Sequence, residues 1–377
     1  MKISILKEKS PYEHRVAASP DTVKKLKQLG FEIFIEKNAG DASNFSDEYY
    51  ANAGAIISED ITKILSDADI LLKVQAPDAD ELKLLPQKAI IIGLLSPYEN
   101  QELVKQYASG NYTSFALELL PRITRAQTMD VLSSQSNLAG YRAVIEASSL
   151  YQGAFPMMMT AAGTISPVRA LIIGAGVAGL QALATARRLG AVVSVFDVRI
   201  AAKEQVESLG GKFIEIPQEE EQNSTYAKEV SDDYKAKQQA LILENIKKSD
   251  IVITTAMIPG KKAPELITKE MVESMKPGSV IVDIATSAGG NCVLSQKDQV
   301  ITHNKVSIIG YSNLAARIAE DASLLYAKNL VSFIELIYDK EHKKINIDHD
   351  DEIIINTLLT QKGEIANQKI KEFYQNG

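Results

Sequence analysis

The sequence contains one cysteine, Cys292, and only four histidines. A single thiol excludes an internal disulfide framework and a cysteine-rich metal site, and it fits a reducing cytoplasm. We expect Cys292 to be a small buried apolar residue. The histidines (His14, His303, His342 and His349) show no paired spacing on one face, so we expect no metal site.

Long apolar runs and clusters of basic residues are also absent. No apolar run approaches the roughly 18 residues that a membrane-spanning helix needs, so we expect no direct membrane insertion. The basic residues are scattered and the net charge is −7, which argues against a nucleic-acid partner. Charges interrupt the apolar run at residues 1–8, which predicts a first strand and not a secretory signal. The methionines at residues 157–159 are expected to pack in the interior.

The length of 377 residues, with 45% hydrophobic residues, predicts two domains, because single cores seldom grow to this size. From residue 1 to about residue 126, strand and helix patterns alternate, which indicates a parallel sheet covered by helices on both faces. The expected strands are residues 3–6, 32–36, 70–74, 89–95 and 112–118, and the expected helices are residues 21–29, 47–53 and 101–107.

A helical pattern at residues 137–151 is long enough to run from one domain into a second alternating unit. The strands expected there are residues 169–173, 192–196, 213–216, 250–254, 279–283 and 306–309. Further on, a helix containing residues 328–337 precedes two strand candidates, residues 344–347 and 352–356, which should pack on the first domain. The predicted fold is α/β, with two Rossmann-like, doubly wound parallel-sheet domains joined by long helices. We place their boundaries at residues 1–134 with 314–377, and 135–313.

A glycine motif follows the apolar strand that ends at Ile173. The run from Gly174 reads GxGxxG, and a helical pattern at residues 181–189 comes after it. Gly174 permits a tight turn, Gly176 lets the backbone approach a pyrophosphate, and Gly179 lets the helix pack closely on the strand. The N–H groups at the start of the helix would bind the anion. Such glycines also occur in turns that bind nothing, but the strand, the helix and a later acid favour a dinucleotide site.

That acid is Asp197, at the end of the next strand, residues 192–196. A carboxylate in this place accepts hydrogen bonds from both ribose hydroxyls and repels a 2′-phosphate, which favours NAD over NADP. Arg199 could attract a 2′-phosphate. With the acid still present, its expected role is to stack on or line the adenosine pocket.

Two polar segments are further candidates. Residues 218–225 have no means of burying themselves, and we interpret them as a mobile loop beside the cofactor, with the aromatic Tyr226 as its contact. A functionless surface loop is the alternative. Residues 121–135 lie where the first domain should meet the second, and there Arg122, Gln127 and Asp130 could bind a carboxamide and a ribose. The alternative is helix capping by Asp130 or Ser133.

Four long runs, residues 122–147, 157–191, 254–268 and 278–291, resemble the NAD(H)-binding component of proton-translocating NAD(P) transhydrogenases, in the alanine dehydrogenase/transhydrogenase family. The resemblance implies a homodimer on the cytoplasmic side of a membrane complex. It also implies hydride transfer between NAD(H) on this chain and NADP(H) on a separate component. The cofactor-binding residues that it implies are Arg122, Ile123, Thr124, Arg125, Gln127, Asp130 and Ser133 at the nicotinamide, Gly174, Gly176, Val177 and Gly179 at the pyrophosphate, Asp197, Val198 and Arg199 at the adenosine ribose, and Thr225 and Tyr226 in the mobile loop. Within that loop, Thr225 and Val230 replace the family's usual glycine and methionine.

Alanine dehydrogenase, which resembles this chain in the same way, is the alternative enzyme. Residues 13–15 and 72–74 contain an arginine and a lysine that match its carboxylate-binding pair. Amino-acid oxidation needs a group that accepts and returns protons, usually histidine. Here Ser96 stands in the region of the dehydrogenase's histidine, and Ser287 in place of its aspartate. Hydride transfer between two nicotinamides needs no such pair. A nucleotide sensor without turnover is a third possibility.

Overall fold

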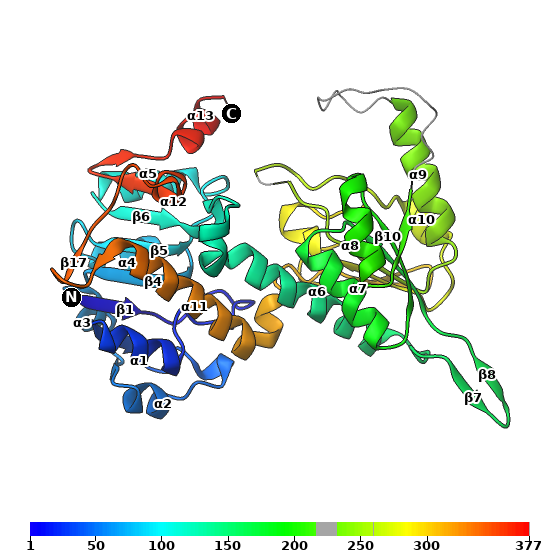
Figure 1. Ribbon diagram of the computed structural model, residues 1–377, viewed down its shortest axis with the longest axis horizontal. Helices are drawn as coiled ribbons and strands as arrows, with labels where there is room; N and C mark the ends of the chain where they lie inside the picture. Colours follow the sequence, from blue (N-terminus) through cyan, green and yellow to red (C-terminus); the bar gives the residue numbers. More distant parts are fainter. Residues whose placement is uncertain (216–231, 259, 377) are drawn as a thin grey trace. The chain divides into compact units, whose positions relative to one another are not determined.

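Two sheets of similar strand order organise the chain. The computed structural model describes residues 1–215, 232–258 and 260–376 (Figure 1). It divides into two compact units, unit 1 with Met1–Gln135 and Ala315–Gly377, and unit 2 with Ser136–Leu314. The first division falls inside helix α6 (Val131–Leu150). The second falls between Leu314 and Ala315, ahead of a short 3-10 helix, so only one of the two connections is a long helix.

The sheet of unit 1 has eight strands in the order β19-β18-β6-β5-β4-β1-β2-β3. The first six strands of the chain pair in parallel, and β18 and β19 are added antiparallel at one edge. The strands are β1 (Lys2–Ile5), β2 (Glu32–Glu36), β3 (Ile56–Ser58), β4 (Ile70–Gln75), β5 (Ile90–Leu94), β6 (Thr113–Ala116), β18 (Leu358–Gln361) and β19 (Glu364–Ile365). A separate two-stranded ribbon pairs β16 (Tyr338–Asp339) with β17 (Lys344–Ile345).

Helices cover both faces of this sheet. Along β4, Ile70 and Leu72 pack in one apolar cluster and Leu71 in another, because successive side chains of a strand point to opposite faces. Burial on both faces explains why the parallel strands are nearly continuous apolar runs. The helices of unit 1 are α1 (Pro20–Gln28), α2 (Asp47–Asn52), α3 (Ile61–Leu65), α4 (Ala79–Leu84), α5 (Gln101–Ser109), α11 (Ala319–Ile337), α12 (Glu352–Thr357) and α13 (Gln368–Asn376), with 3-10 turns at Asp41–Ser43, Leu117–Leu119, η3 (Thr124–Met129) and Ala315–Ile318.

The main sheet of unit 2 has seven strands in the order β11-β10-β9-β12-β13-β15-β14, all parallel except β14. Its strands are β9 (Arg169–Ile173), β10 (Val192–Phe196), β11 (Lys212–Ile214), β12 (Ile251–Thr254), β13 (Val280–Asp283), β14 (Val300–His303) and β15 (Val306–Ile309). Its helices are α7 (Val177–Arg188), α8 (Lys203–Ser208), α9 (Asp232–Ile246) and α10 (Lys269–Glu273), with 3-10 turns η4 (Ile200–Ala202) and η5 (Ile284–Ala288). The predicted α/β class with two mostly parallel sheets is confirmed.

Several predicted details are wrong. Residues 352–356 form helix α12 and not a strand, because the Asp351 side chain accepts the Ile353 N–H and caps a helix there. The strand that joins the first sheet is β18 instead. The short strands β3 and β14 were not predicted. Helix α7 begins four residues before the predicted start at residue 181. The predicted mobile loop, with Thr225, Tyr226 and Val230, lies outside the described residues.

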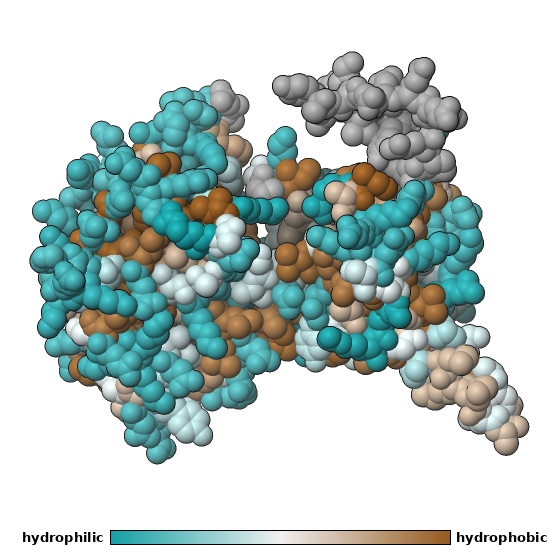
Figure 2. All heavy atoms as spheres, viewed as in Figure 1, coloured by the Kyte–Doolittle hydropathy of each residue, from teal (hydrophilic) through white to brown (hydrophobic). Residues whose placement is uncertain are grey.

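The methionine run is also not where we expected it. Met157, Met158 and Met159 are 59%, 44% and 77% exposed. They lie at the start of a hairpin formed by β7 (Met158–Thr160) and β8 (Gly163–Ile165), which stands away from the rest of unit 2 (Figures 1 and 2). The prediction of interior packing is therefore wrong within a single chain. Among the described residues, no helix combines the length and the apolar character needed to cross a bilayer.

Candidate dinucleotide-binding site

The strand order of unit 2 fixes one position where a ligand can bind. The order β11-β10-β9-β12-β13-β15 runs outward in both directions from the neighbouring strands β9 and β12. In such sheets, ligands bind beyond the carboxyl ends of the strands where the order reverses. The last residues of four strands lie in register there, since Ile173 pairs with Phe196 and Thr254, and Thr254 pairs with Asp283.

The three motif glycines follow β9 and have three different surroundings. Gly174 has a φ of +106°, and a Cβ atom placed on it would lie 2.4 Å from Thr255 Oγ1. A Cβ on Gly179 would lie 1.8 Å from the Gly174 carbonyl oxygen, so helix and turn can meet only without it. A Cβ on Gly176 would meet no atom within 4 Å. Gly174 and Gly179 are therefore required by the fold itself, whereas Gly176 faces open space.

The start of helix α7 suits an anion. Its N-cap is Gly176, which has no side chain to accept hydrogen bonds from the N–H groups of the first turn. Those groups, together with the helix dipole, attract negative charge. Arg187 and Arg188 lie in the last turn, where positive charge complements the opposite end of the dipole.

Asp197 follows β10 and forms a compact network with the glycine turn. Its Oδ2 accepts the Ala175 N–H at 2.6 Å, and its Oδ1 accepts the Arg199 N–H at 2.8 Å. The Arg199 guanidinium adds hydrogen bonds of 3.0 Å to both oxygens. Burial alone would raise the pKa of Asp197, but these hydrogen bonds outweigh it and lower the pKa. The carboxylate is charged, and it neutralises the arginine that could otherwise attract a 2′-phosphate.

Exposed apolar side chains gather on the same edge of this sheet. Val177, Val198, Ile200, Met257 and Ile258 are between 42% and 60% exposed. They stand on the connections that follow β9, β10 and β12. Apolar surface with a few polar groups at fixed positions is typical of sites for flat aromatic ligands such as the rings of a dinucleotide.

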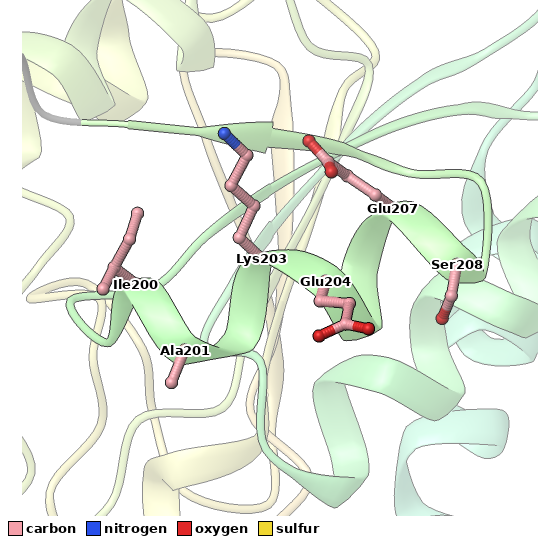
Figure 3. Close-up of a pocket in the computed structure, with 6 residues that line it drawn as sticks. All are labelled: Ile200, Ala201, Lys203, Glu204, Glu207 and Ser208. Carbon is pink, nitrogen blue, oxygen red and sulfur yellow. The ribbon is translucent and has the colours of Figure 1, made fainter.

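A hollow on helix α8 lies just beyond this edge (Figure 3). Ile200, Lys203, Glu204 and Glu207 are among its lining residues. In Figure 3, Lys203 and Glu207 point to one side of the helix and Glu204 to the other, so the polar groups do not converge. Lys203 also pairs with Glu215. We therefore assign the site to the glycine turn and not to this hollow.

The polar strip of unit 1 forms η3 and the start of α6. Asp130 Oδ1 accepts the Ser133 N–H at 2.8 Å, and Asp130 Oδ2 accepts the Ser133 hydroxyl. This is the helix-capping arrangement that we gave as the alternative. Arg125 makes two hydrogen bonds of 2.7 Å to Asp351. The remaining strip residues differ in exposure: Arg122, Thr124 and Gln127 are exposed, and Ile123 is half-buried.

At the reversal point of unit 1, between β1 and β4, buried charges pair with each other. Glu13 accepts two side-chain hydrogen bonds from Arg15, at 2.6 and 2.7 Å. Lys73 Nζ lies 3.3 Å from Glu8 and 3.5 Å from Glu81. These five side chains are at most 9% exposed. Burial, partly offset by Lys73, raises the pKa of Glu8 to about 6. Arg15 and Lys73, which match the carboxylate-binding pair of alanine dehydrogenase, are therefore already neutralised by acids of this chain.

Sequence reasoning missed several buried polar residues. Glu118 accepts the Ser96 N–H, and its Oε2 is buried with no hydrogen-bond partner. Burial raises the pKa of Glu118 to about 7. Asp283 and Asn291, both fully buried beside the glycine turn, were also missed. The sequence offers no signal for them, because their partners are backbone groups brought close by the fold.

Comparison with known proteins identifies the family. Residues 4–139 match the N-terminal domain of alanine dehydrogenase/PNT, and residues 143–368 match its C-terminal domain. A relative from Rickettsia prowazekii, the first segment of a divided NAD(P) transhydrogenase alpha subunit, is 53% identical over 100% of this chain and 98% of its own length. A solved transhydrogenase structure from Sinorhizobium meliloti has a TM-score of 0.86 at 47% identity, covering 98% of this chain and 100% of that one.

An L-alanine dehydrogenase structure also superposes, with a TM-score of 0.83, covering 100% of this chain and 99% of that one. Its identity is only 22%, so it shows a shared fold and nothing more. The resemblance to transhydrogenase inferred from the sequence is confirmed. The chain belongs to the alanine dehydrogenase/PNT family and, within it, to the NAD(P) transhydrogenase alpha subunits.

Proposed function

We propose that this chain binds NAD(H) at the glycine turn of unit 2 and exchanges hydride between it and NADP(H) held by a partner component. The observation that carries the proposal is the open Gly176, at the uncapped start of α7 and next to a charged Asp197. This arrangement supplies a place for a pyrophosphate and an acceptor for ribose hydroxyls, in a chain 53% identical to a transhydrogenase subunit.

In this proposal the pyrophosphate lies over the turn formed by Gly174, Gly176, Val177 and Gly179. The adenosine ribose then binds Asp197, beside Val198 and Arg199. Because Arg199 occupies both oxygens of Asp197, its guanidinium must give up at least one hydrogen bond when the hydroxyls bind. The released guanidinium can stack on the adenine, as expected from the sequence. The remaining negative charge disfavours NADP.

The nicotinamide is assigned to the strip of unit 1. Arg122 and Gln127 are exposed and carry donors that suit a carboxamide. Asp130 is held by Ser133, which fixes the direction of its carboxylate. Ile123, Thr124 and Arg125 complete the strip, with Arg125 anchored by Asp351. Thr225 and Tyr226, assigned to a loop that closes over the nucleotide, lie outside the described residues.

Bound NAD(H) supplies the centre that gives or takes the hydride. The chain's own residues bind it, orient it and exclude water, since no substrate proton moves and no acid–base pair is needed. Positioning of this kind can supply much of a rate enhancement through effective molarity. Amino-acid oxidation is disfavoured for the opposite reason, because Arg15 and Lys73 are paired internally and serines stand where the proton-transferring groups would be.

We also propose that the chain is a homodimer that acts at the cytoplasmic face of a membrane through its partner subunits. The exposed methionines of the β7–β8 hairpin support the dimer. Soluble monomers seldom expose several large apolar side chains in one projecting segment, whereas protein interfaces are rich in methionine. The membership among the transhydrogenase alpha subunits supports the location at a membrane complex.

The test mixes the purified chain with an NADP(H)-binding transhydrogenase component and follows hydride exchange between nucleotide analogues. Arg122→Gln should slow exchange by about 10²-fold, the effect of losing one positioning contact, while the dissociation constant for NADH changes much less. Arg188→Gln, an exposed arginine at the far end of α7, should change neither. Sedimentation of the chain alone measures the dimer.

Other results would support other functions. NADH binding without exchange would point to a nucleotide sensor. Reduction of pyruvate with ammonia by the chain alone would establish an alanine dehydrogenase. If the chain failed to bind NADH, the site assignment itself would be wrong.

A further inference from the structure

The connection after β12 supports the glycine turn from its side. Thr255 N–H donates to the Ile173 carbonyl at 2.9 Å, and Thr255 Oγ1 lies 3.3 Å from the Gly174 carbonyl oxygen. The same hydroxyl is the atom that a Cβ on Gly174 would strike. Thr255 therefore sets how far the turn can move toward β12.

The next residue, Ala256, is held by a side chain from a distant part of unit 2. Asn291 Oδ1 accepts the Ala256 N–H at 3.0 Å, and Asn291 Nδ2 donates to the Ala256 carbonyl at 2.9 Å. The second hydrogen of Nδ2 goes to the Pro264 carbonyl at 2.8 Å. Only an amide can accept one hydrogen bond and donate two in this way. Asn291 is fully buried, so water cannot replace these partners.

Asn291 is in turn fixed by Asp283, the last residue of β13. Asp283 Oδ2 accepts the N–H groups of Asn291 and Cys292 at 2.8 and 2.9 Å. Its Oδ1 accepts the Thr254 hydroxyl and the Ala285 N–H at 3.1 and 3.0 Å. Both carboxylate oxygens are thus occupied, and Asp283 is fully buried. The carboxylate ties the ends of β12 and β13 to the segment that carries Asn291.

We infer that Asn291 is a positioning residue for the dinucleotide: it fixes Ala256, keeps Thr255 against Gly174, and so sets where the backbone meets the pyrophosphate. Asp283 serves Asn291 in the same way. The inference rests on the proposed function, since it assumes that the glycine turn binds a dinucleotide. It adds a second support for that turn, from β12 and β13, that the motif itself does not contain.

The test compares two ligands in the full chain, ADP-ribose, which has a pyrophosphate, and adenosine, which has none. Asn291→Asp keeps the shape but removes both donors. Thr255→Val also keeps the shape and removes the hydroxyl next to Gly174. Each should weaken ADP-ribose binding about tenfold, as the loss of a contact worth about 1.4 kcal/mol does, and change adenosine binding less than about twofold. Calorimetry measures both dissociation constants.

The matched control is Thr286→Val, which removes a buried hydroxyl that donates to the Gly310 carbonyl at 2.9 Å but touches neither Thr255 nor Ala256. It should lower the thermal midpoint as the other variants do and leave both affinities unchanged. Equal losses for the two ligands, or no loss for either, would overturn the inference while leaving the proposed function intact. If Asn291→Asp does not fold, Thr255→Val decides. A wild-type chain that does not bind ADP-ribose would overturn the proposed function as well.

Discussion

The two units have the same order for their first six strands, but the positions where that order reverses differ in chemistry. In unit 2, three residues, Gly174, Ala175 and Gly176, connect β9 to α7. In unit 1, residues 6–19 connect β1 to α1, and this longer segment contributes Glu8, Glu13 and Arg15. The corresponding edge is therefore open backbone in one unit and a set of buried ion pairs in the other.

The comparison shows that topology chooses the place of a site and the first connection chooses its chemistry. A short glycine turn leaves N–H groups and space for an anion. A longer connection brings side chains, and in unit 1 three acids, Glu8, Glu13 and Glu81, meet the two cations Arg15 and Lys73. With its charges already paired, that edge has no cation left to hold a substrate carboxylate.

The largest effect should come from breaking the charge balance of unit 1. Lys73→Met removes the cation that faces Glu8 and leaves a buried carboxylate without its counter-charge. Losing one partner of a buried pair costs about 3–5 kcal/mol. We expect this loss in the free energy of unfolding at pH 8, measured by urea denaturation. Part of it should return at pH 5, because Glu8, whose pKa is already raised to about 6, then takes up a proton.

Lys9→Met is the matched control for this variant. Lys9 also faces Glu81, at 3.2 Å, but its side chain is 53% exposed, and exposed pairs contribute roughly 0–1 kcal/mol. ADP-ribose binding should be unchanged in both variants. Equal destabilisation by the two substitutions would show that burial does not distinguish these lysines, and the contrast drawn above between the units would fail.

The next effect is on the pH dependence of stability. Glu118 of unit 1 has a pKa raised from 4.5 to about 7, mainly by burial. The folded state therefore keeps a proton that the unfolded state releases, so the contribution of Glu118 to stability is present below about pH 4.5 and is lost as the pH rises through 7. The difference in unfolding free energy between wild type and Glu118→Gln should change by up to about 3 kcal/mol between pH 4.5 and 8.

Asp197 of unit 2 provides the opposite case. Its pKa is lowered in the folded state, so its contribution is present above the unfolded pKa and is lost only as the pH falls through the folded pKa. The difference between wild type and Asp197→Asn should therefore stay constant from pH 5 to 8. A constant difference for Glu118→Gln over the same range would mean that Glu118 is not desolvated.

How much the sequence could predict follows the same division between local and distant contacts. The glycine turn, the strands around it and Asp197 were predictable, because each depends on residues close in sequence and on a period that survives in any context. Asn291 and Glu118 were not, because their partners are distant backbone groups. The segment of α12 was misassigned because its isoleucines suit a strand equally well, and only the cap at Asp351 decides. The hairpin methionines show that composition alone does not report exposure.

The smallest expected effect is also the one that best separates binding from folding. Gly176→Ala adds a methyl group where no atom lies within 4 Å, at a φ of −79° that alanine adopts readily. Stability should stay the same or rise by about 0.4–1 kcal/mol, because alanine restricts the unfolded chain. NADH affinity should nevertheless fall about tenfold, or about 1.4 kcal/mol, since the methyl group occupies the approach of the pyrophosphate.

Gly174→Ala is the counterpart for this last prediction, because its φ of +106° and the 2.4 Å approach to Thr255 make it costly for folding itself. Thermal unfolding and NADH titration of both variants should therefore give two patterns, affinity lost with stability kept for Gly176, and both lost for Gly174. If Gly176→Ala bound NADH as tightly as the wild type, the open space beside α7 would not be where the pyrophosphate lies. The distinction between the two edges would then rest on packing alone and not on ligand binding.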